Sequence, residues 1–452
     1  MAETNTTNRK RTELLGHPVG LFILFFTELW ERFSYYGMRA LLVLYMTAIS
    51  TGDNPGFGWS NEDALQLYGW YTMLVYISSI PGGWIADKIL GQKKTVMLGG
   101  ALLCAGHGVL AIDSISAFYA GLGLIIAGVG CLKPNISTMV GGLYGAKDER
   151  RDVGFTIFYI GINIGALLAP LLCGYLGEKY GWHLGFGLAA IGMFFGQIVY
   201  IWGQKYLKGV GDFIGNDDNP HKEFQDKPLT SQEKDRVKVL FISFLLVILF
   251  WGAFEQAGGL LNLWADQKTD RMFLGWEIPA SWFQSVNSFF IITLGSLIAG
   301  FWYRRKMKGK EASSLFKMPV GLIIQGVGFF FMAYSALEFA GNGSTSFVWL
   351  ILFYLFSTIG ELCLSPVALS FITKLAPVKY ASLMMGAFWA ATGLGNKLAG
   401  LLGEYSQSAG EFEIFTGIAI FSIAIGGLVL LILKPLKRLT HGAEDLAVQP
   451  AH

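Results

Sequence analysis

The stretch TELWERFSYYGMR, residues 27–39, places four charged side chains inside an apolar run, Val19 to Ile49, that is long enough to cross a bilayer. On a helix, its charged and tyrosine side chains recur at spacings that put them on one stripe. The stripe contains Glu28, Glu31, Arg32, Tyr35, Tyr36 and Arg39. One charge at the bilayer centre costs about 2.5–3.5 kcal/mol on insertion scales. The stripe therefore predicts a functional, water-accessible cavity; the alternative is a charge cluster that only fastens helices together.

The composition of the whole chain excludes an ordinary soluble protein. Of the 452 residues, 53% are hydrophobic and only 15% are charged, whereas a soluble surface needs many more charges. Lipid admits only helices or closed barrels, and the short alternating strands of a barrel are absent. The sequence therefore predicts an all-α polytopic membrane protein. Twelve apolar blocks have spanning length, at about 18–50, 62–89, 93–112, 114–143, 153–177, 183–205, 236–265, 280–304, 317–338, 346–375, 380–404 and 412–433.

The basic residues are distributed unequally between the two sets of loops. Apart from those inside spans, nearly all of the 34 lysines and arginines lie in alternate loops and in the two termini, and the opposite loops hold only Lys179, Lys268 and Arg271. By the positive-inside rule, both termini are cytoplasmic, which agrees with an even number of helices. We expect a multi-pass protein of the cell (inner) membrane without a signal peptide before its first span.

The longest polar stretch, residues 206–235, divides the predicted spans into six and six. We expect an amino-terminal bundle over 1–205, a cytoplasmic linker over 206–235, and a carboxy-terminal bundle over 236–452. Within the linker, Thr230 to Glu233 (TSQE) has the spacing of a capping box that starts the next helix. Two related six-helix bundles are the architecture of the major facilitator fold.

Three further ionisable residues lie inside predicted spans. Lys133 lies in GCLKPNIST, Glu255 in FWGAFEQAGG and Glu361 in STIGELCLSP. Acids in both halves and bases in the first half predict a cavity with separated positive and negative poles, which suits a zwitterion such as a peptide. Carboxylates beside an arginine are also the chemistry that a proton site needs. For Lys397, in GLGNKLAG, packing or snorkelling is as good an interpretation as function.

Several segments resemble the proton-dependent oligopeptide transporter family. ELWERFSYYG (28–37) matches the ExxERFxYYG signature, while GGWIADKILGQKKTVMLGGALLCAG (82–106) and FTIFYIGINIGAL (155–167) resemble two other signature segments. FWGAFEQ (250–256), GELCLSP (360–366) and GAFWAATGLGN (386–396) extend the resemblance over nearly the whole chain. Two features differ. The linker is too short for the two extra helices of many bacterial members, and Gly69 stands at the histidine position of animal members.

The resemblance implies roles for individual residues. Glu28, Glu31, Arg32 and Lys133 resemble the family's proton-coupling cluster. Arg39 and Glu255 resemble a gating ion pair that breaks when the glutamate, itself part of proton coupling, is protonated. Glu361 resembles the acid that receives a peptide's amino terminus, with Arg39 and Lys133 facing its carboxylate. The peptide pocket would also include Tyr35, Tyr36, Tyr76, Asn163, Asn287, Ser365 and Trp389. Without the resemblance, Tyr76, Trp389 and the two asparagines would be interpreted as helix packing.

The loop GGWIADKILGQKK also has two interpretations. It resembles a conformational element that latches the cytoplasmic side in facilitators, which assigns Asp87 a gating role. Alternatively, it is a tight turn in which Gly83 permits close packing and Asp87 caps a helix end. No histidine is expected to carry protons; His107 stands alone in its span. The four cysteines are expected to be small buried residues, with neither a disulfide nor a metal site.

These features predict a symporter that imports di- and tripeptides with protons by alternating access. Protons would be the coupling ion, with no cofactor or metal, and peptide and lipid, but no nucleic acid, would be the partners of a functional monomer. The alternative is a facilitator for another solute, such as nitrate or a drug-like amphiphile. A channel with a charged pore is a further alternative that the six-plus-six organisation disfavours. An enzyme is not expected, because no zinc motif, nucleophile elbow or phosphate-binding loop is found.

Overall fold

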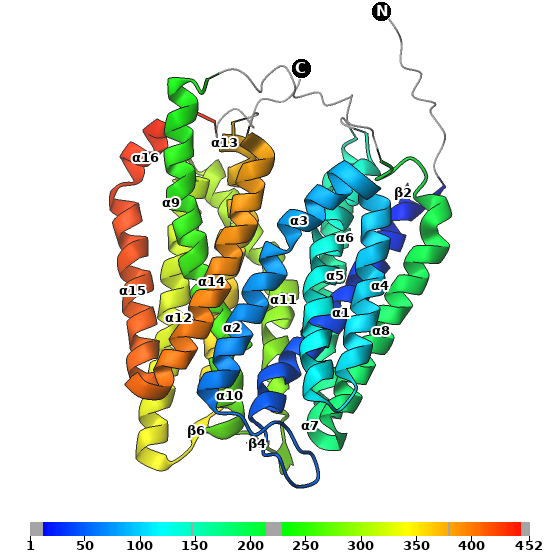
Figure 1. Ribbon diagram of the computed structural model, residues 1–452. Helices are drawn as coiled ribbons and strands as arrows, with labels where there is room; N and C mark the ends of the chain where they lie inside the picture. Colours follow the sequence, from blue (N-terminus) through cyan, green and yellow to red (C-terminus); the bar gives the residue numbers. More distant parts are fainter. Residues whose placement is uncertain (1–11, 146–147, 214–227, 378–379, 444–452) are drawn as a thin grey trace, which may run out of the picture.

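The structure, a computed structural model, describes residues 12–145, 148–213, 228–377 and 380–443, and it is almost entirely helical, as predicted (Figure 1). The helices of the first half are α1 (Val19–Thr47), α2 (Asn61–Ile77), α3 (Ser79–Ile85), α4 (Gln92–Leu110), α5 (Ile115–Gly142), α6 (Arg150–Ala169), α7 (Tyr175–Tyr180) and α8 (Trp182–Gly203). Those of the second half are α9 (Ser231–Phe254), α10 (Leu260–Gln267), α11 (Phe283–Met307), α12 (Ser314–Asn342), α13 (Val348–Leu375), α14 (Ala381–Ala409), α15 (Glu411–Leu431) and α16 (Leu433–Leu439).

Short π-helical and 3₁₀ turns join some of these helices: η1 (Ala86–Leu90), η2 (Pro170–Gly174), η3 (Gln204–Tyr206), η6 (Glu255–Ala257) and η7 (Ala280–Trp282). The strands are two residues each: β1 (Glu13–Leu14), β2 (His17–Pro18), β3 (Thr269–Asp270), β4 (Met272–Phe273), β5 (Trp276–Glu277) and β6 (Thr345–Ser346). β1 pairs with β2 and β4 with β5 in antiparallel fashion, and β3 pairs with β6 in parallel. These pairs tie loops together at the ends of the helices.

Eight helical stretches among the described residues are long and apolar enough to cross a membrane. They are α5, α6 with α7, α8, α9 with α10, α11, α12, α13 and α15. The composition of two other long helices explains why they fall outside this set. α1 has 29 residues but carries the four charges of the opening stretch, and α14, also of 29 residues, contains five glycines with Lys397 and Glu404. Length and apolarity therefore miss helices that carry several charges or many glycines.

The helices form two groups that lie side by side in Figure 1. α1 packs against α6 and α8, and α4 against α5 and α8, in the first group; α12 packs against α13 and α15, and α9 against α14, in the second. The groups meet where α2 packs against α14 and α6 against α11. The described ends, near β2 and α16, lie at the same end of the helices. Residues 214–227 of the predicted linker lie outside the described residues.

The contact between α2 and α14 brings backbone against backbone. A Cβ atom added at Gly69 would lie 2.8 Å from the Cα atom of Gly400, and one added at Gly400 would lie 2.6 Å from the Cα atom of Gly69. No side chain fits between the helices at this point, so both glycines are required by close approach. Gly69 is therefore a packing position in this chain.

The predicted capping box is confirmed: the Thr230 hydroxyl accepts from the Glu233 amide, and the Glu233 carboxylate accepts from the Thr230 amide. The predicted span over 236–265 falls within one helical stretch, Ser231–Gln267, but that stretch is not a regular α-helix throughout. The helix changes at Glu255 into the 3₁₀ turn η6, and α10 starts only at Leu260. Gly258 at this break lies so close to the Tyr68 hydroxyl that an added Cβ would be 2.0 Å from it. The break therefore accommodates a tyrosine from the other group.

Candidate functional site

A cavity of about 980 Å³ lies between the two groups of helices. It reaches from Arg39 and Glu255 in the interior to Asp87 and Gln92 near the start of α4, at the end where the described termini lie (Figure 1). Most of the residues that the sequence singled out line this cavity: Glu28, Arg32, Tyr36, Arg39, Asp87, Lys133, Asn163, Glu255, Asn287, Glu361 and Trp389. The structure thus brings together residues from α1, α5, α6, α11, α13 and α14.

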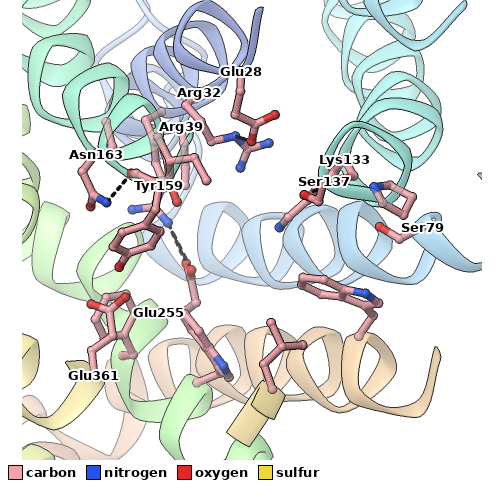
Figure 2. A pocket seen from close by; sticks show the side chains of 18 of the residues that line it. Glu28, Arg32, Arg39, Ser79, Lys133, Ser137, Tyr159, Asn163, Glu255 and Glu361 are labelled. Carbon is pink, nitrogen blue, oxygen red and sulfur yellow. Dashed lines mark hydrogen bonds and ion pairs between the residues drawn. The ribbon is translucent and has the colours of Figure 1, made fainter. Parts of the chain in front are cut away.

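Arg39 and Glu255 form a buried ion pair across the two groups (Figure 2). Arg39 Nη1 lies 3.1 Å from both carboxylate oxygens of Glu255, and Arg39 Nη2 donates to Gln284 Oε1 at 3.2 Å. The Tyr68 hydroxyl donates to Glu255 Oε2 at 2.9 Å. Both charged side chains are less than one-tenth exposed. Removing one partner of a buried ion pair destabilises a structure by several kcal/mol, because the other charge is left uncompensated. The contact between the two groups is therefore strongly sensitive to the charge of Glu255.

The remaining charges of the opening stretch form a second cluster on α1. Arg32 lies between two carboxylates: it pairs with Glu31, and its Nε atom lies 3.3 Å from Glu28 Oε1. The Oε2 atom of Glu28 is buried, and no described residue forms a hydrogen bond with it; Glu28 lines the cavity, whereas Glu31 is fully buried. One guanidinium thus serves two acids, and one carboxylate oxygen of the cluster is left without a partner among the described residues.

Lys133 is held by aromatic rings, and it forms no ion pair with another residue that the structure describes. Its Nζ atom lies 3.8 Å from the ring centroid of Tyr76 and 5.0 Å from that of Trp389. Tyr76 comes from α2 and Trp389 from α14, so this cation–π arrangement joins the two groups of helices. The Lys133 ammonium therefore keeps its hydrogen-bonding capacity for a ligand in the cavity.

Glu361 lies on the far side of the pocket from Lys133 (Figure 2). Its Oε2 atom accepts from Asn287 Nδ2 at 2.9 Å, and the same amide lies 3.0 Å from Thr358 Oγ1. On α6, Asn163 donates to the Tyr159 carbonyl at 2.9 Å. The cavity thus has a carboxylate at one wall and an ammonium at another. This polarity suits a ligand with a positive and a negative end.

Four predicted site residues do not line the cavity. Glu31 and Tyr35 are buried within α1, with the ring of Tyr35 packed against Tyr36. Tyr76 contributes through its ring to the Lys133 contact. Ser365 lies outside the lining, and its buried hydroxyl has no hydrogen-bond partner among the described residues. The substrate role predicted for Ser365 has no support in this placement.

Other lining residues were not predicted. Trp251 and Phe254 lie in the quoted segment FWGAFEQ, and Tyr159 lies in FTIFYIGINIGAL. Gln284 contacts Arg39 and lies one helical turn before Asn287, so helical spacing from that asparagine could have identified it. Tyr354 lies seven positions, or two helical turns, before Glu361 on α13, so it shares the face of that glutamate. Helical periodicity, counted from Asn287 and Glu361, would therefore have identified these two lining residues in the sequence.

At the end opposite the described termini, the two groups are closed against each other by hydrogen bonds. Glu178 of α7 accepts from the amides of Ala280 and Ser281 at 2.8 and 2.9 Å and from the Ser281 hydroxyl at 2.5 Å. Lys179 pairs with Glu277 at 2.8 Å. Nearer the interior, Asn262 donates to the Ala40 carbonyl at 2.8 Å. We call this set of contacts the far closure, and it seals the end of the cavity beyond Arg39.

Other predicted residues stay apart from the cavity. His107 is fully buried in α4, and neither ring nitrogen has a hydrogen-bond partner among the described residues, in agreement with a packed side chain. The ammonium of Lys397 lies 4.4 Å from the ring centroid of Trp70, which is a packing contact. All four cysteines are free thiols.

Comparison with known proteins places this geometry in a family. The family model described as PTR2, POT family, matches residues 93–216 and 213–413. The uncharacterized transporter YclF of Bacillus subtilis is 37% identical over 482 residues, which cover 94% of this chain and 96% of that protein. A di-/tripeptide transporter of Lactococcus lactis subsp. cremoris is 35% identical over 490 residues, covering 96% and 98%. A crystal structure of the peptide transporter POT in complex with sulfate superposes with a TM-score of 0.89 at 34% identity, covering 95% of this chain and 97% of that one. The chain belongs to the POT family, as its sequence motifs predicted.

Proposed function

We propose that this protein is a symporter that imports di- and tripeptides with protons by alternating access. The observation that carries the proposal is the polarity of the cavity, which Lys133, Arg39 and Glu361 all line and in which Glu361 lies on the far side of the pocket from Lys133. A peptide carries an ammonium and a carboxylate at its two ends, so it complements both walls. The Lactococcus lactis relatives named di-/tripeptide transporters, and a POT transporter structure in complex with alafosfalin, support the same class of ligand.

The proposed fold is the major facilitator fold, with twelve spans in two bundles over 1–205 and 236–452 and a linker over 206–235. α1, α2 with α3, α4 and α14 supply the four spans that apolarity alone does not detect. The distribution of basic residues orients both termini toward the cytoplasm, so the cavity of this structure opens inward. We place the protein in the bacterial inner membrane as a functional monomer, with protons as coupling ion and no cofactor.

In the proposed cycle, protonation of Glu255 releases Arg39 and frees the two bundles to separate at the outer end. Released Arg39 and Lys133 then face the peptide carboxylate, while Glu361 receives the amino terminus and Tyr36, Asn163, Asn287 and Trp389 contact the peptide. Glu28, Glu31 and Arg32 pass the proton onward, because two carboxylates share one guanidinium in that cluster. Asp87 acts at the inner end of the cavity, where it would contribute to closure.

The direct test is uptake of labelled dialanine into proteoliposomes, with and without an inward proton gradient. We expect accumulation above the external concentration only with the gradient, because a coupled carrier draws the free energy from proton flow. Saturable counterflow would exclude a channel. Uptake of nitrate or of a drug-like amphiphile, without competition by dialanine, would instead favour the alternative facilitator. The carboxylate of Glu361 argues against an anion carrier, since it repels anions.

The far closure provides a second prediction, on Glu178. Glu178→Gln replaces a carboxylate that accepts three hydrogen bonds with an amide whose NH₂ group cannot accept one. Each lost charge-assisted bond costs about 1.5–3 kcal/mol, so the outward-open population should increase about tenfold or more. In right-side-out vesicles, a Ser288→Cys reporter in the cavity should then react about tenfold faster with an impermeant maleimide.

Glu277→Gln is the matched control, because it removes a carboxylate at the same end that is 45% exposed and pairs with Lys179 at 2.8 Å and with Arg271 at 3.0 Å. Exposed pairs contribute about 0–1 kcal/mol, so labelling should change little. Equal labelling rates for Glu178→Gln and the parent protein would contradict a role of Glu178 in the far closure.

A further inference from the structure

A second, smaller cavity lies away from the transport site, at the end of α11 that the positive-inside rule assigns to the cytoplasm. It measures about 360 Å³. Leu297 and Phe301, which are 66% and 54% exposed, line its membrane side. Bases line the other side: Arg304, Arg305, Lys308 and Lys310. The cavity, which we call the basic groove, thus combines an apolar side and a cationic side at the boundary between membrane and cytoplasm.

The backbone holds these bases in place. Gly309 has a φ of 65°, its amide donates to the Lys306 carbonyl at 2.9 Å, and the Lys310 amide donates to the Arg305 carbonyl at 3.2 Å. This pair of bonds is the Schellman motif that ends helices with a glycine in the left-handed region. The Arg305 guanidinium also donates to the Glu311 carbonyl at 2.7 Å. Lys308 and Lys310 therefore belong to an ordered helix end.

The positive charge of the basic groove is not neutralised within the part of the chain that the structure describes. Arg304, Lys308 and Lys310 form no ion pair or side-chain hydrogen bond with the residues described. Glu311 is the acid next to them in sequence, but it pairs with Lys437 at 2.8 Å and accepts from the Ser313 amide. Partial burial opposes its ionisation, yet these hydrogen bonds lower the pKa of Glu311 to about 2, so it stays ionised and engaged with Lys437.

An apolar groove of about 280 Å³ continues from the basic groove between α11, α12 and α13. Phe301 and Arg305 line both, and Ile298, Val320, Ile324 and Ile359 line the apolar part. α11 is the least buried of the eight apolar spans: only 17% of its window is buried. An elongated ligand with an anionic head and an apolar chain would therefore find both parts of its binding site in one continuous depression.

We propose that the basic groove and its apolar continuation bind one anionic phospholipid of the cytoplasmic leaflet. Its phosphate would contact Arg304, Lys308 and Lys310, and one acyl chain would lie against Ile298 and Val320. Bases in the last turn of α11 are explained by their favourable interaction with the helix dipole. This interaction does not explain Lys308 and Lys310, which lie beyond the last turn. Basic pockets between transmembrane helices on the cytoplasmic side are sites for anionic lipid head groups. Gln284 and Asn287 on α11 line the transport cavity, so this lipid would contact a helix of that site.

The test measures binding of phosphatidylglycerol to the purified full-length protein by native mass spectrometry over a titration. The variant Arg304→Gln/Lys308→Gln/Lys310→Gln should raise the Kd for phosphatidylglycerol by at least about tenfold, because each base near an anionic head group strengthens the electrostatic attraction. The matched control, Lys374→Gln/Lys434→Gln/Arg438→Gln, removes three charges from the same side outside the groove and should change Kd by less than about twofold. Thermal unfolding checks that each variant is folded.

Three outcomes would overturn the proposal: equal loss of affinity in both triple variants, equal affinity of the parent protein for phosphatidylcholine, and full competition by soluble glycerophosphoglycerol. The last would assign the site to a free phosphate compound. Gly309→Ala, which strains the left-handed position, should also weaken phosphatidylglycerol binding while keeping every charge. Because all readouts are lipid binding, they are independent of whether the protein transports peptides.

Discussion

Replacing Glu255 with glutamine is expected to abolish proton-driven accumulation of dialanine while peptide exchange across the membrane continues. Glutamine keeps an acceptor for Arg39 and Tyr68, both of which contact the carboxylate here, but it cannot take up or release a proton in the transport cycle. The variant also leaves the buried Arg39 charge without an opposite charge, which weakens the contact between the two groups of helices. Internal dialanine should therefore rise only to the external concentration, with or without a pH gradient.

The control for this experiment is Glu62→Gln, which removes a carboxylate from the exposed first turn of α2. It should accumulate dialanine as the parent protein does. Counterflow by Glu255→Gln must be measured in parallel, because a misfolded variant would lose exchange as well. Accumulation against a concentration gradient by Glu255→Gln would refute the role of this glutamate in coupling.

The second large effect is expected at Glu361. Glu361→Gln should weaken dialanine binding by about 10- to 100-fold, because a hydrogen bond to a charged group contributes about 1.5–3 kcal/mol. Glutamine retains an acceptor for the Asn287 amide, which donates to Glu361 at 2.9 Å, so the local structure should persist. Binding is measured by competition with a labelled peptide in detergent or nanodiscs.

Acetylated dialanine distinguishes the loss of a specific contact between Glu361 and the peptide ammonium from a general disruption of the binding site. It lacks the ammonium group, so its affinity should be low in the parent protein and nearly the same in Glu361→Gln. Thr358→Val is the matched variant, because Thr358 contacts the same asparagine without carrying charge; its effect on dialanine should be smaller. Parent-like affinity of Glu361→Gln for dialanine would rule out recognition of the amino terminus by Glu361.

Much of the site could be predicted from sequence, because charge within lipid is expensive and therefore conspicuous. Glu28, Arg32 and Arg39 share one stripe of α1, and the structure places all three on the cavity. Glu255 and Glu361 stood out for the same reason, as acids inside predicted spans, and the family motifs then suggested their roles. The same cost explains why counting apolar residues alone misses α1: the side chains that define the site also reduce its apolarity.

What sequence could not predict depends on how helices rotate against one another. Ser365 follows Glu361 by four positions on α13, yet only Glu361 lines the cavity. The break after α9 depends on Tyr68 from a distant helix, which occupies the space beside Gly258. Likewise, Glu178 gains its role only because η7 places the amides of Ala280 and Ser281 beside it. Contacts of this kind between remote segments produce no periodic pattern in the local sequence, so they could not be predicted from it.

The bare contact between Gly69 and Gly400 has a mechanical consequence. Interlocked side chains would resist rotation of one bundle against the other, because each step would require rotamer changes or a gap between the helices. Here two backbones touch with no side chain between them, at the middle of α2 and in the second half of α14. The helices can therefore rotate against each other at this contact without losing packing. A bulky side chain at either position would clash with the facing helix during this rotation. It would raise the barrier between the inward-open and outward-open forms while leaving the binding cavity itself unchanged.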